Sequence, residues 1–514
     1  GSYVTYNGDL ESTSPTEDND AFSVDVYDGP ASAGGTTTDG NFTVTQGKVE
    51  CKALSYVHND ETNDATISAN AAGAIDDLTA LTKGTFACWT RADNWSATSD
   101  DDHWIYNLSD STDDYFFVVH MDDSSGTTAK VRTALYENGA YQWDVSTDSR
   151  VCSLDTWHHI AVTQDGSGPV IYVDGVKPAQ TFTNSTDTAA WWDELHGIGA
   201  DRNMMGGGMQ YNNYAHQYEP DGDFRDFRFY NHGLSADQVA SLYSGSYNIT
   251  PMHWIKCDEG SGTLVDSGTD TAWTVTNTSL TYVNGTLDLD GKLETAADGT
   301  FSAPRGKVQL AGNFEPAGTW IHNNGTLETN NTAEKDFNIN ASTALYNWTH
   351  DGSTMTIEDA TDGHTIIENA LTINSGAHLK PQDGADVTFG TSSQACTVTN
   401  NGTFENRNSN NTVTFKGASS LYPFAYEGTD FNWDGDASAG NVQNYILSNC
   451  NWNPDITTGE YVNIQLAGDC EFDAITVSAN STLDVDGQRV YSSGTVDING
   501  NLKMGAGMWH AGGD

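Results

Sequence analysis

The chain has 514 residues and a formal net charge of −50, with 21 lysines and arginines against 71 aspartates and glutamates. Nucleic-acid binding requires a basic surface, and an anionic membrane would repel this chain, so we expect neither partner. The acidity is typical of a very soluble protein with sites for hard cations. Many Gly, Asn, Thr and Ser residues, together with β-branched ones, indicate an all-β fold rich in turns.

Cysteine and apolar content set further limits. The seven cysteines are sparse and form no Cys-x-x-Cys pair, so we expect neither a zinc site nor a disulfide framework. No apolar run reaches the roughly 18 residues of a membrane-spanning helix. The last residues, 508–514, do not resemble a finished domain edge, and we expect the natural chain to continue beyond them.

Residues 1–50 are polar and contain one short alternating run at 22–27, which we interpret as an N-terminal arm or attachment strand. The clearest element of the next region is residues 157–176, which read WHHIAVTQDGSGPVIYVDGV. Apolar and polar residues alternate on both sides of a Gly-rich turn, and this pattern is typical of a β-hairpin. We predict that the set Trp157, Ile160, Val162, Ile171 and Val173 includes core residues of one antiparallel sandwich, with Trp157 on the strand face opposite Ile160 and Val162.

A short helix is predicted after Leu234. Ser235 and Gln238 have the spacing of a capping box, in which each side chain bonds the backbone of the other residue. Val239, Leu242 and Tyr243 give the helix one apolar face. Because so short a helix is unstable alone, we expect it to pack against the strands that precede it.

Three segments in order resemble laminin-G-like, concanavalin-A-like jelly rolls. They are GTFACW at 84–89, the hairpin at 157–176, and GDFRDFRFYNHGLS at 222–235. The resemblance implies a jelly-roll β-sandwich over residues 51–250. It says little about function, because this fold is shared by lectins, hydrolases, adhesins and viral proteins.

Residues 251–268 are similar to the opening of another jelly roll, but the hairpin and closing strand that should follow are missing. We treat 251–283 as a junction, with completion of the first sandwich as the alternative. From residue 284 a turn dipeptide, a small polar residue and an apolar residue recur, as in Asn284-Gly-Thr-Leu287 and Asn401-Gly-Thr-Phe404. These repeats predict a parallel β-solenoid over 284–514, truncated at its C-terminus, with a Greek-key or meander array as the alternative.

The repeats resemble those of phage appendage proteins and large surface adhesins. Cys450 and Cys470 lie 20 residues apart, and each ends a run that is typical of a strand. We therefore expect them to stack on neighbouring rungs, about 4.8 Å apart, without a disulfide.

No catalytic motif is present. Jelly-roll glucanases need two carboxylates on one strand in a pattern close to E-x-D-x-E, and this chain lacks it. HExxH, GxSxG and P-loop motifs are absent as well, so we expect no enzymatic activity.

Clusters of aspartates in predicted loops offer the hard oxygen ligands that calcium prefers. The resemblance also implies calcium, because laminin-G-like domains often hold it at the rim. The alternative interpretation is solvated acidic loops. The candidate ligands are Asp101, Asp102, Asp122, Asp123, Asp221 and Asp223.

A glycan site requires aromatic platforms beside polar side chains. The tryptophan pair at 191–192 and the long Tyr-, Asn- and Gly-rich loop at 204–218 meet this requirement. Exposed loops of this composition often serve in recognition. Packing of the loop against a neighbouring chain is the alternative. The candidate residues are Trp191, Trp192, Tyr211, Tyr214 and Tyr218.

Together these features predict a structural protein of the virion surface, such as a phage fibre, spike or decoration protein, whose jelly roll binds a host-surface glycan. Its partners would be that glycan or other virion proteins, in a homo-oligomer for which a trimer is one form. A cell-surface adhesin or surface-layer protein is the alternative, and a polysaccharide-acting hydrolase or lyase is the third. We expect the protein on a virion surface or outside the cell.

Overall fold

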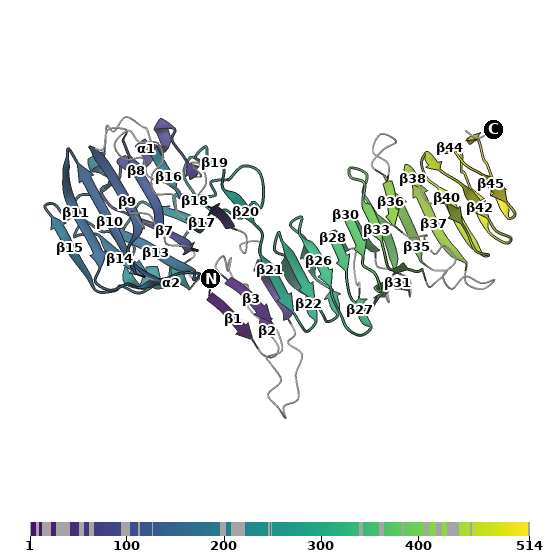
Figure 1. Ribbon diagram of the computed structural model, residues 1–514, viewed down its shortest axis with the longest axis horizontal. Helices are drawn as coiled ribbons and strands as arrows, with labels where there is room; N and C mark the ends of the chain where they lie inside the picture. The colour runs from purple at the N-terminus through teal and green to yellow at the C-terminus, as the bar shows by residue number, and fades with distance from the viewer. Residues whose placement is uncertain are drawn as a thin grey trace, which may run out of the picture. The chain divides into compact units, whose positions relative to one another are not determined.

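The computed structural model (Figure 1) describes residues 2–6, 10–12, 22–26, 42–50, 56–60, 66–93, 103–110, 114–125, 127–195, 202–206, 221–244, 247, 249–338, 343–358, 364–382, 385–406, 411–417, 424–428, 442–452 and 455–511. These residues contain two α-helices and are otherwise mainly strands, which confirms the all-β prediction. Neither helix is long and apolar enough to cross a membrane. Contacts divide the chain into two units, residues 1–3, 17–23 and 52–285 in one and residues 4–16, 24–51 and 286–514 in the other.

The first unit is a sandwich of two antiparallel sheets, which we call sheet I and sheet II. Sheet I has the order β14 (Val170–Val173), β13 (His158–Gln164), β7 (Gly84–Ala92), β17 (Asp221–Tyr230), β5 (Tyr56–Asp60) and β20 (Thr281–Val283), with β18 (His253–Ile255) beside β17. Sheet II has the order β15 (Gln180–Ser185), β11 (Ala140–Thr147), β10 (Thr128–Glu137), β9 (Tyr115–Ser125), β8 (His103–Ser109), β16 (Arg202–Met205), β6 (Thr66–Ser68) and β19 (Thr276–Thr278), with β12 (Cys152–Ser153) beside β10.

The predicted hairpin is β13 and β14, which pair with Ile160 opposite Val173 and Val162 opposite Ile171. These four residues lie in the sandwich core. The prediction that the five residues include core residues is confirmed; Trp157 is the member outside the core, and its side chain is half-buried. Strand alternation explains the difference, because Trp157 falls on the same face as His159 and Ala161, which points away from the core.

The predicted helix is α2 (Ala236–Tyr243), and the capping box is present. The Gln238 backbone N–H donates to the Ser235 hydroxyl at 3.3 Å, and the Ser235 N–H donates to the Gln238 side chain at 2.9 Å. Val239 and Leu242 pack on the outer face of sheet I, in a cluster with Ala87, Ala161, Tyr172 and Tyr230. The remaining helices of the described chain are α1 (Ala72–Thr79) and the 3-10 turn η2 (Trp192–Leu195).

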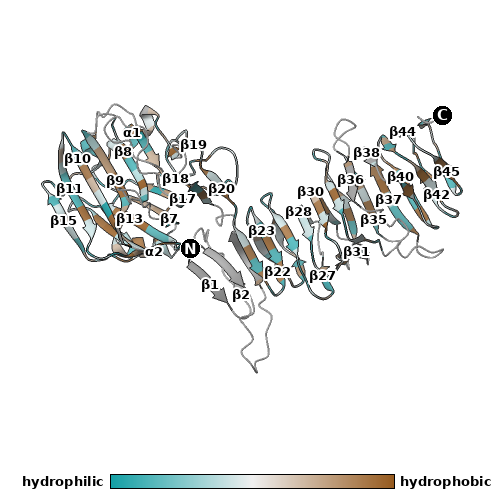
Figure 2. Cartoon of the chain, viewed as in Figure 1, coloured by the Kyte–Doolittle hydropathy of each residue, from teal (hydrophilic) through white to brown (hydrophobic). Residues whose placement is uncertain are grey.

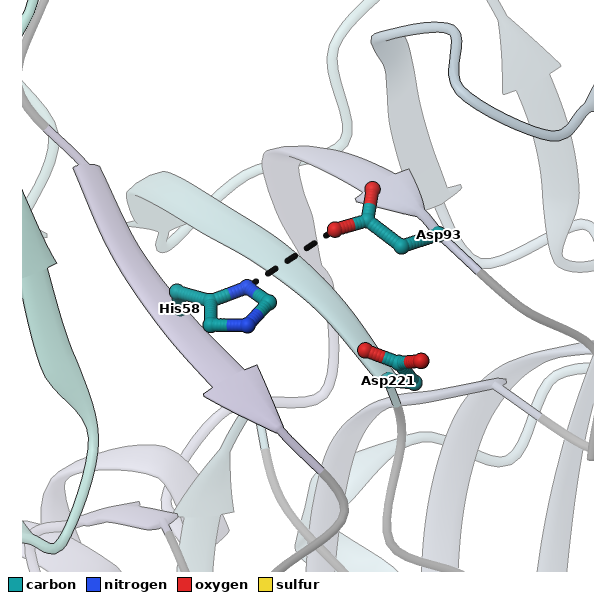
Figure 3. Close-up of side chains that lie close together, drawn as sticks. All are labelled: His58, Asp93 and Asp221. Carbon is teal, nitrogen blue, oxygen red and sulfur yellow. Dashed lines mark ion pairs between the residues drawn. The ribbon is translucent and has the colours of Figure 1, made fainter.

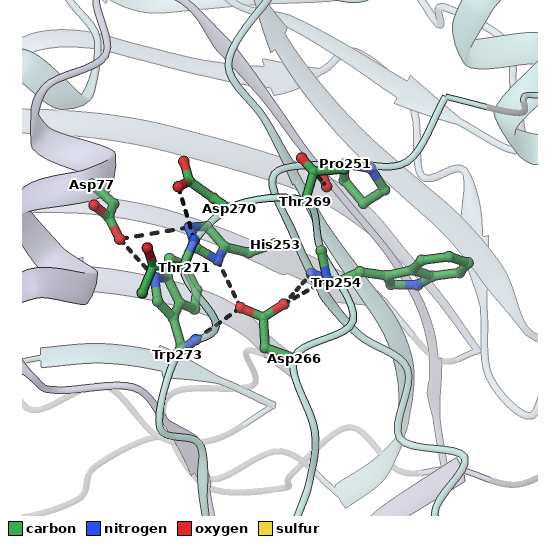
Figure 4. A network of polar contacts seen from close by, with 10 residues as sticks. Asp77, Pro251, His253, Trp254, Asp266, Thr269, Asp270, Thr271 and Trp273 are labelled. Atoms are coloured by element: carbon green, nitrogen blue, oxygen red, sulfur yellow. Dashed lines mark hydrogen bonds and ion pairs between the residues drawn. The ribbon is translucent and has the colours of Figure 1, made fainter.

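Residues 251–283 complete this sandwich and do not form a separate junction. β18 pairs with β17, β19 with β6, and β20 with β5. Figure 4 shows the polar network that anchors the segment: the Asp266 carboxylate lies 2.7 Å from the His253 ring and accepts the backbone N–H groups of Trp254 and Trp273. The Trp273 indole N–H donates to Asp77 of α1 at 3.2 Å, which ties the segment to the rest of the sandwich.

The second unit is a parallel β-solenoid, as predicted for residues 284–514. Its largest sheet contains β1 (Ser2–Tyr6), β3 (Phe22–Val26), β21 (Thr286–Leu289), β23 (Lys307–Leu310), β26 (Thr326–Thr329), β28 (Thr343–His350), β30 (His364–Ile373), β32 (Asp386–Phe389), β33 (Thr397–Asn400), β35 (Thr412–Lys416), β36 (Phe424–Gly428), β37 (Gln443–Ser448), β38 (Cys450–Trp452), β40 (Val462–Leu466), β41 (Cys470–Phe472), β43 (Thr482–Asp484), β44 (Arg489–Ser492), β46 (Asn501–Lys503) and β47 (Met508–Ala511).

Two smaller sheets form the other faces of the solenoid. One contains β2 (Leu10–Ser12), β4 (Phe42–Glu50), β22 (Leu293–Ser302), β24 (Phe314–Pro316), β25 (Thr319–Ile321), β27 (Lys335–Asn338), β29 (Thr354–Glu358), β31 (His378–Gln382) and β34 (Thr403–Phe404). The other contains β39 (Ile456–Thr457), β42 (Ile475–Val477) and β45 (Val496–Ile498).

The described N-terminal strands, β1 to β4, belong to the solenoid sheets and do not form a separate arm. β4 pairs in parallel with β22, with Phe42 opposite Leu293 and Glu50 opposite Ser302, and β3 pairs with β21. The sandwich is therefore an insertion between two strands of the solenoid, β4 and β21. Chain ends of a domain often lie close together, and this makes such insertions structurally tolerable.

Apolar and polar residues alternate along many solenoid strands, as the brown and teal bands of Figure 2 show, and in strands such as β37 and β40 every second residue is buried. β37 stacks on β40 with Leu447 opposite Leu466, a repeat of 19 residues, and β38 stacks on β41 with Trp452 opposite Phe472, a repeat of 20. This register places Cys450 and Cys470 on neighbouring rungs, and both are buried free thiols. The predicted rung of 20 residues is confirmed.

Candidate functional site

Of the predicted aromatic platforms, the structure describes only the tryptophan pair. Trp191 and Trp192 are fully buried, and their rings pack against Phe117 at 5.1 and 5.7 Å. Neither ring can therefore offer a face to a ligand, and this assignment is wrong: the chain after β15 turns inward and its two tryptophans fill the sandwich core. Tyr211, Tyr214 and Tyr218 lie outside the described residues.

The predicted calcium ligands are dispersed. Asp122 forms an ion pair with Arg132 at 3.2 Å on the outer face of sheet II. Asp101, Asp102 and the side chain of Asp123 lie outside the described part of the chain. Only Asp221 and Asp223 come together, at the beginning of β17.

At this point the outer face of sheet I carries a cluster of polar side chains. Figure 3 shows His58 of β5, Asp93 after β7, and Asp221 of β17, each of which offers an atom within 4.8 Å of the other two. Strand pairing explains the cluster, because Asp223 lies opposite both His58 and Arg91 in the sheet. Every second residue of each strand faces the same side, so Asp221 and Asp93 extend the same rows.

Gly222 allows these strands to approach closely. A Cβ atom at this position would lie 2.1 Å from the carbonyl oxygen of Arg91 and 2.8 Å from the His103 ring. Any larger residue would push β17 away from β7. The glycine therefore holds the carboxylates of Asp221 and Asp223 beside β7 and β5.

Asp223 is the buried centre of the cluster, with a side chain only 1% exposed. It is paired with the Arg91 guanidinium and lies 2.9 Å from Nδ1 of His58. Arg91 also binds Asp93, with Nε 3.0 Å from Oδ1. Burial raises the pKa of Asp223 to about 6, although the positive charge of Arg91 opposes the shift.

The donor set does not fit calcium. Calcium takes six to eight oxygen ligands, whereas His58 offers a nitrogen and the cluster supplies few carboxylates. Arg91 already forms ion pairs with Asp93 and Asp223. Calcium thus remains a prediction for the acidic loops outside the described residues, and a melting curve with and without chelator tests it.

Two half-buried aromatic rings border the cluster. Tyr56 and Trp157 meet edge to face, with ring centroids 5.2 Å apart. The Arg91 guanidinium lies 5.8 Å from the Tyr56 ring and 5.9 Å from the Trp157 ring, and Arg225 lies 4.8 Å from Trp157. Contacts between guanidinium groups and aromatic faces are attractive and orient both partners.

Beneath these rings lies a buried aromatic floor. Trp89 is only 2% exposed and packs between His159, at 5.3 Å, and Tyr243 of α2, at 5.5 Å. Arg225 lies 5.6 Å from Trp89 and so joins the floor to the exposed rings. We call the whole surface the Trp157 patch, defined as Tyr56, His58, Trp89, Arg91, Asp93, Trp157, Asp221, Asp223 and Arg225.

The outer face of sheet II has a second aromatic group. Phe116 stacks on Tyr136 at 4.8 Å, and Tyr136 meets Tyr141 at 4.9 Å. Near them Asp144 accepts two hydrogen bonds from Arg132, at 3.0 and 2.8 Å. Phe116 is 6% exposed, so only the two tyrosines, both half-buried, offer ring surface here.

Only Asp221, Asp223 and Trp157 of the patch were singled out in the sequence, and Trp157 was named for the hairpin rather than for a binding site. The sequence contains a signal for the patch, because aromatic and charged residues occupy every second position in two segments. These are Trp89, Arg91 and Asp93 in one segment, and Asp221, Asp223 and Arg225 in the other. Alternating aromatic, basic and acidic residues indicate a polar outer face. Which strands lie side by side could not be derived from that pattern.

Residues 60–240 match the sequence family Laminin_G_3, described as the concanavalin A-like lectin/glucanases superfamily. They form a concanavalin A-like domain. No curated protein matches the chain. The family match includes every patch residue except Tyr56 and His58, so most of the patch belongs to the concanavalin A-like domain.

Solved structures similar to this domain include a heptameric SAP-like pentraxin from Limulus polyphemus, with 13% identity, 37% of this chain and 81% of that chain covered, and a TM-score of 0.26. The CBM40 of Ruminococcus gnavus IT-sialidase bound to α2,3-sialyllactose has 14% identity, coverage of 36% and 96%, and a TM-score of 0.30. Domains LG4-5 of the mouse laminin α1 chain have 10% identity, coverage of 38% and 45%, and a TM-score of 0.25.

Proposed function

We propose that this protein is a non-enzymatic surface protein whose concanavalin A-like domain binds a neutral glycan at the Trp157 patch. The observation that carries the proposal is the half-buried Trp157 and Tyr56 pair beside charged hydrogen-bonding groups. An aromatic ring provides apolar contact for the C–H face of a sugar. Carboxylates and guanidinium groups bond the hydroxyls and fix their orientation.

Charge supports a neutral glycan over an acidic one. The patch combines the carboxylates of Asp93, Asp221 and Asp223 with the guanidinium groups of Arg91 and Arg225, which leaves a small net negative charge. The whole chain carries −50. The negative charge of the patch and that of the whole chain both repel anionic sugars, whereas a neutral glycan experiences no such repulsion.

Binding without hydrolysis is favoured by the position of Asp223. A glycosidase needs a carboxylic acid that reaches the scissile bond and a second carboxylate at a fixed distance. Asp223 has the raised pKa expected of an acid catalyst, yet its side chain is buried and held by Arg91 and His58. Its role is to position the groups around it.

The solenoid suits a place outside the cell or on a virion. A stack of rungs forms an extended support, because repeat architectures are quasi-one-dimensional. A phage fibre, spike or decoration protein remains our leading proposal, with a homo-oligomer as its assembly. A cell-surface adhesin or surface-layer protein is the alternative, and location of the chain in purified virions distinguishes the two.

The test is binding of the full chain to an array of neutral and sialylated glycans. Trp157→Ala removes the platform but no core residue, and we expect at least about tenfold weaker binding to the preferred neutral glycan. Tyr136→Ala is the matched control, because it removes a half-buried ring on the outer face of sheet II. Unchanged binding by Trp157→Ala, or loss on Tyr136→Ala alone, contradicts the proposal.

A further inference from the structure

The solenoid has a groove of its own on the outer side of its largest sheet. The groove has a volume of about 320 Å³ and crosses β35, β37, β40, β43 and β46. This volume falls within the range of about 300–1,000 Å³ that is typical of ligand sites. It lies in the other structural unit from the Trp157 patch and is independent of it.

Register explains the composition of the groove. One row of outward side chains runs Thr412, Asn444, Asn463 and Thr482, each opposite the next in the parallel ladder. Neighbouring strands lie about 4.8 Å apart, so these four side chains extend over about 14 Å. The row presents amide and hydroxyl groups at a regular spacing, each able to donate and to accept hydrogen bonds.

The second row faces the first across the groove. Ile446, Gln465, Asp484 and Lys503 occupy successive strands of the same ladder. Asp484 and Lys503 lie 3.8 Å apart, so their charges cancel locally. In a chain with a net charge of −50, this neutral groove with one aliphatic side chain favours an uncharged ligand.

Some polar side chains of the groove are bound within the fold: Asn444 donates to the Val442 carbonyl at 3.3 Å, and Gln465 donates to Asp486 at 3.3 Å. Asn463 and Thr482 keep hydrogen-bonding capacity. The Asn463 amide donates to Asn444 at 3.3 Å, but among the described residues its own oxygen accepts no hydrogen bond, and the Thr482 hydroxyl has no partner. Asparagine is also disfavoured in strands, where Thr and Val are better suited. Stacked amides can stabilise parallel strands, but Thr482 interrupts this row after two asparagines.

We infer that this groove binds a neutral, hydroxyl-rich oligosaccharide chain that lies across the solenoid strands. A linear chain of sugar hydroxyls matches a row of alternating donors and acceptors, and Ile446 contacts a sugar face. Because the lining offers hydrogen bonds and little apolar surface, each contact adds only modest free energy. The affinity therefore comes from several sugar units held at once.

The test uses the full chain with Trp157→Ala, so that the sandwich patch does not contribute. The probes are neutral linear hexasaccharides of glucose and of N-acetylglucosamine on an array, with sialylated and sulfated glycans as the anionic arm. We expect a neutral hexasaccharide to bind, and Asn463→Ala with Gln465→Ala to weaken it at least tenfold. Bound sugar should also slow hydrogen exchange in β37 and β40.

The matched control is Asn347→Ala with Asn369→Ala. Both are half-buried asparagines on the same sheet but outside the groove, so they should leave binding unchanged. Failure of every neutral hexasaccharide to bind Trp157→Ala, or equal loss in both double variants, overturns the inference. A change in oligomeric mass with the groove variant, without sugar binding, assigns the groove to a second copy and also overturns it.

The outcomes separate the two sites. If the unmodified chain binds neutral glycans and Trp157→Ala abolishes all binding, the Trp157 patch stands and the groove proposal fails. If Trp157→Ala has no effect and only the groove variant abolishes binding, the groove stands and the patch fails.

Discussion

At the scale of single residues, alternation along the strand decides what each side chain can do. Trp157 precedes an apolar run, and its size favours a core position in the sequence. The structure places it on the opposite face from Ile160 and Val162, where it is half-buried beside Arg91. Trp191 and Trp192 show the reverse, since adjacent tryptophans in a polar loop are fully buried. Residue type alone therefore did not locate the recognition surface.

Asp223 gives a prediction for pH dependence. Its pKa in the folded protein is about 6, above the ordinary value of 3.8. As the pH rises, the Asp223 carboxyl therefore loses its proton in the unfolded chain before it does so in the folded protein, and this favours unfolding. The contribution of Asp223 to the free energy of unfolding is present below about pH 4 and lost by about pH 6. The full effect is about 3 kcal/mol.

We expect Asp223→Asn to flatten the fall in unfolding free energy between pH 4 and pH 6, measured by denaturant titration. The exposed Asp76→Asn is the control, and its pH profile should match that of the unmodified protein. If Asp223→Asn leaves the slope of unfolding free energy against pH unchanged, the prediction is contradicted. Arg91 would then hold the Asp223 carboxylate ionised over the whole range from pH 4 to pH 6.

At the scale of elements, the solenoid strands combine an inward apolar face with an outward polar one. Leu466 is fully buried and stacks in register on Leu447, whereas its neighbour Gln465 is exposed. We expect Leu466→Ala to lower the free energy of unfolding by about 2–5 kcal/mol and Gln465→Ala by less than about 0.5 kcal/mol. Equal effects in denaturant unfolding would contradict the assigned register.

The cap of α2 allows a second measurement on the sandwich. Ser235→Ala removes the hydroxyl that accepts the Gln238 N–H, and loss of such a cap costs about 1 kcal/mol. Ser244→Ala, at the other end of the helix, is the control, because its hydroxyl donates to the Ser241 carbonyl of the same helix and takes no part in the capping box. A larger loss for the control would show that the capping box does not stabilise the helix.

At the scale of the whole molecule, sequence patterns predicted both architectures but not their connection. Three jelly-roll segments predicted the sandwich and the Asn-Gly-Thr repeats predicted the solenoid, because each of these patterns lies within a short stretch of sequence. The N-terminal strands could not be assigned, since β4 pairs with β22 across an insertion of more than 200 residues. The Trp157 patch was missed for the same reason: β5, β7, β13 and β17 are adjacent only after folding.

The insertion predicts that the solenoid folds without the sandwich. We expect a chain in which residues 52–285 are replaced by a short Gly-Ser linker to keep its β-sheet circular dichroism and to melt cooperatively. The register of Phe42 on Leu293 needs no residue of the sandwich. Aggregation or loss of β structure in this variant, with residues 52–285 folded when expressed alone, contradicts the division into two units.

The central claim is that the Trp157 patch holds a neutral glycan. The most direct measurement is a crystal structure of the protein with the neutral glycan that binds best on the array. The account predicts a sugar ring against Trp157 and Tyr56, with its hydroxyls bonded to Asp93, Asp221 or Arg91. A glycan bound instead beside Tyr136 and Tyr141 on sheet II, with the Trp157 patch empty, would contradict it.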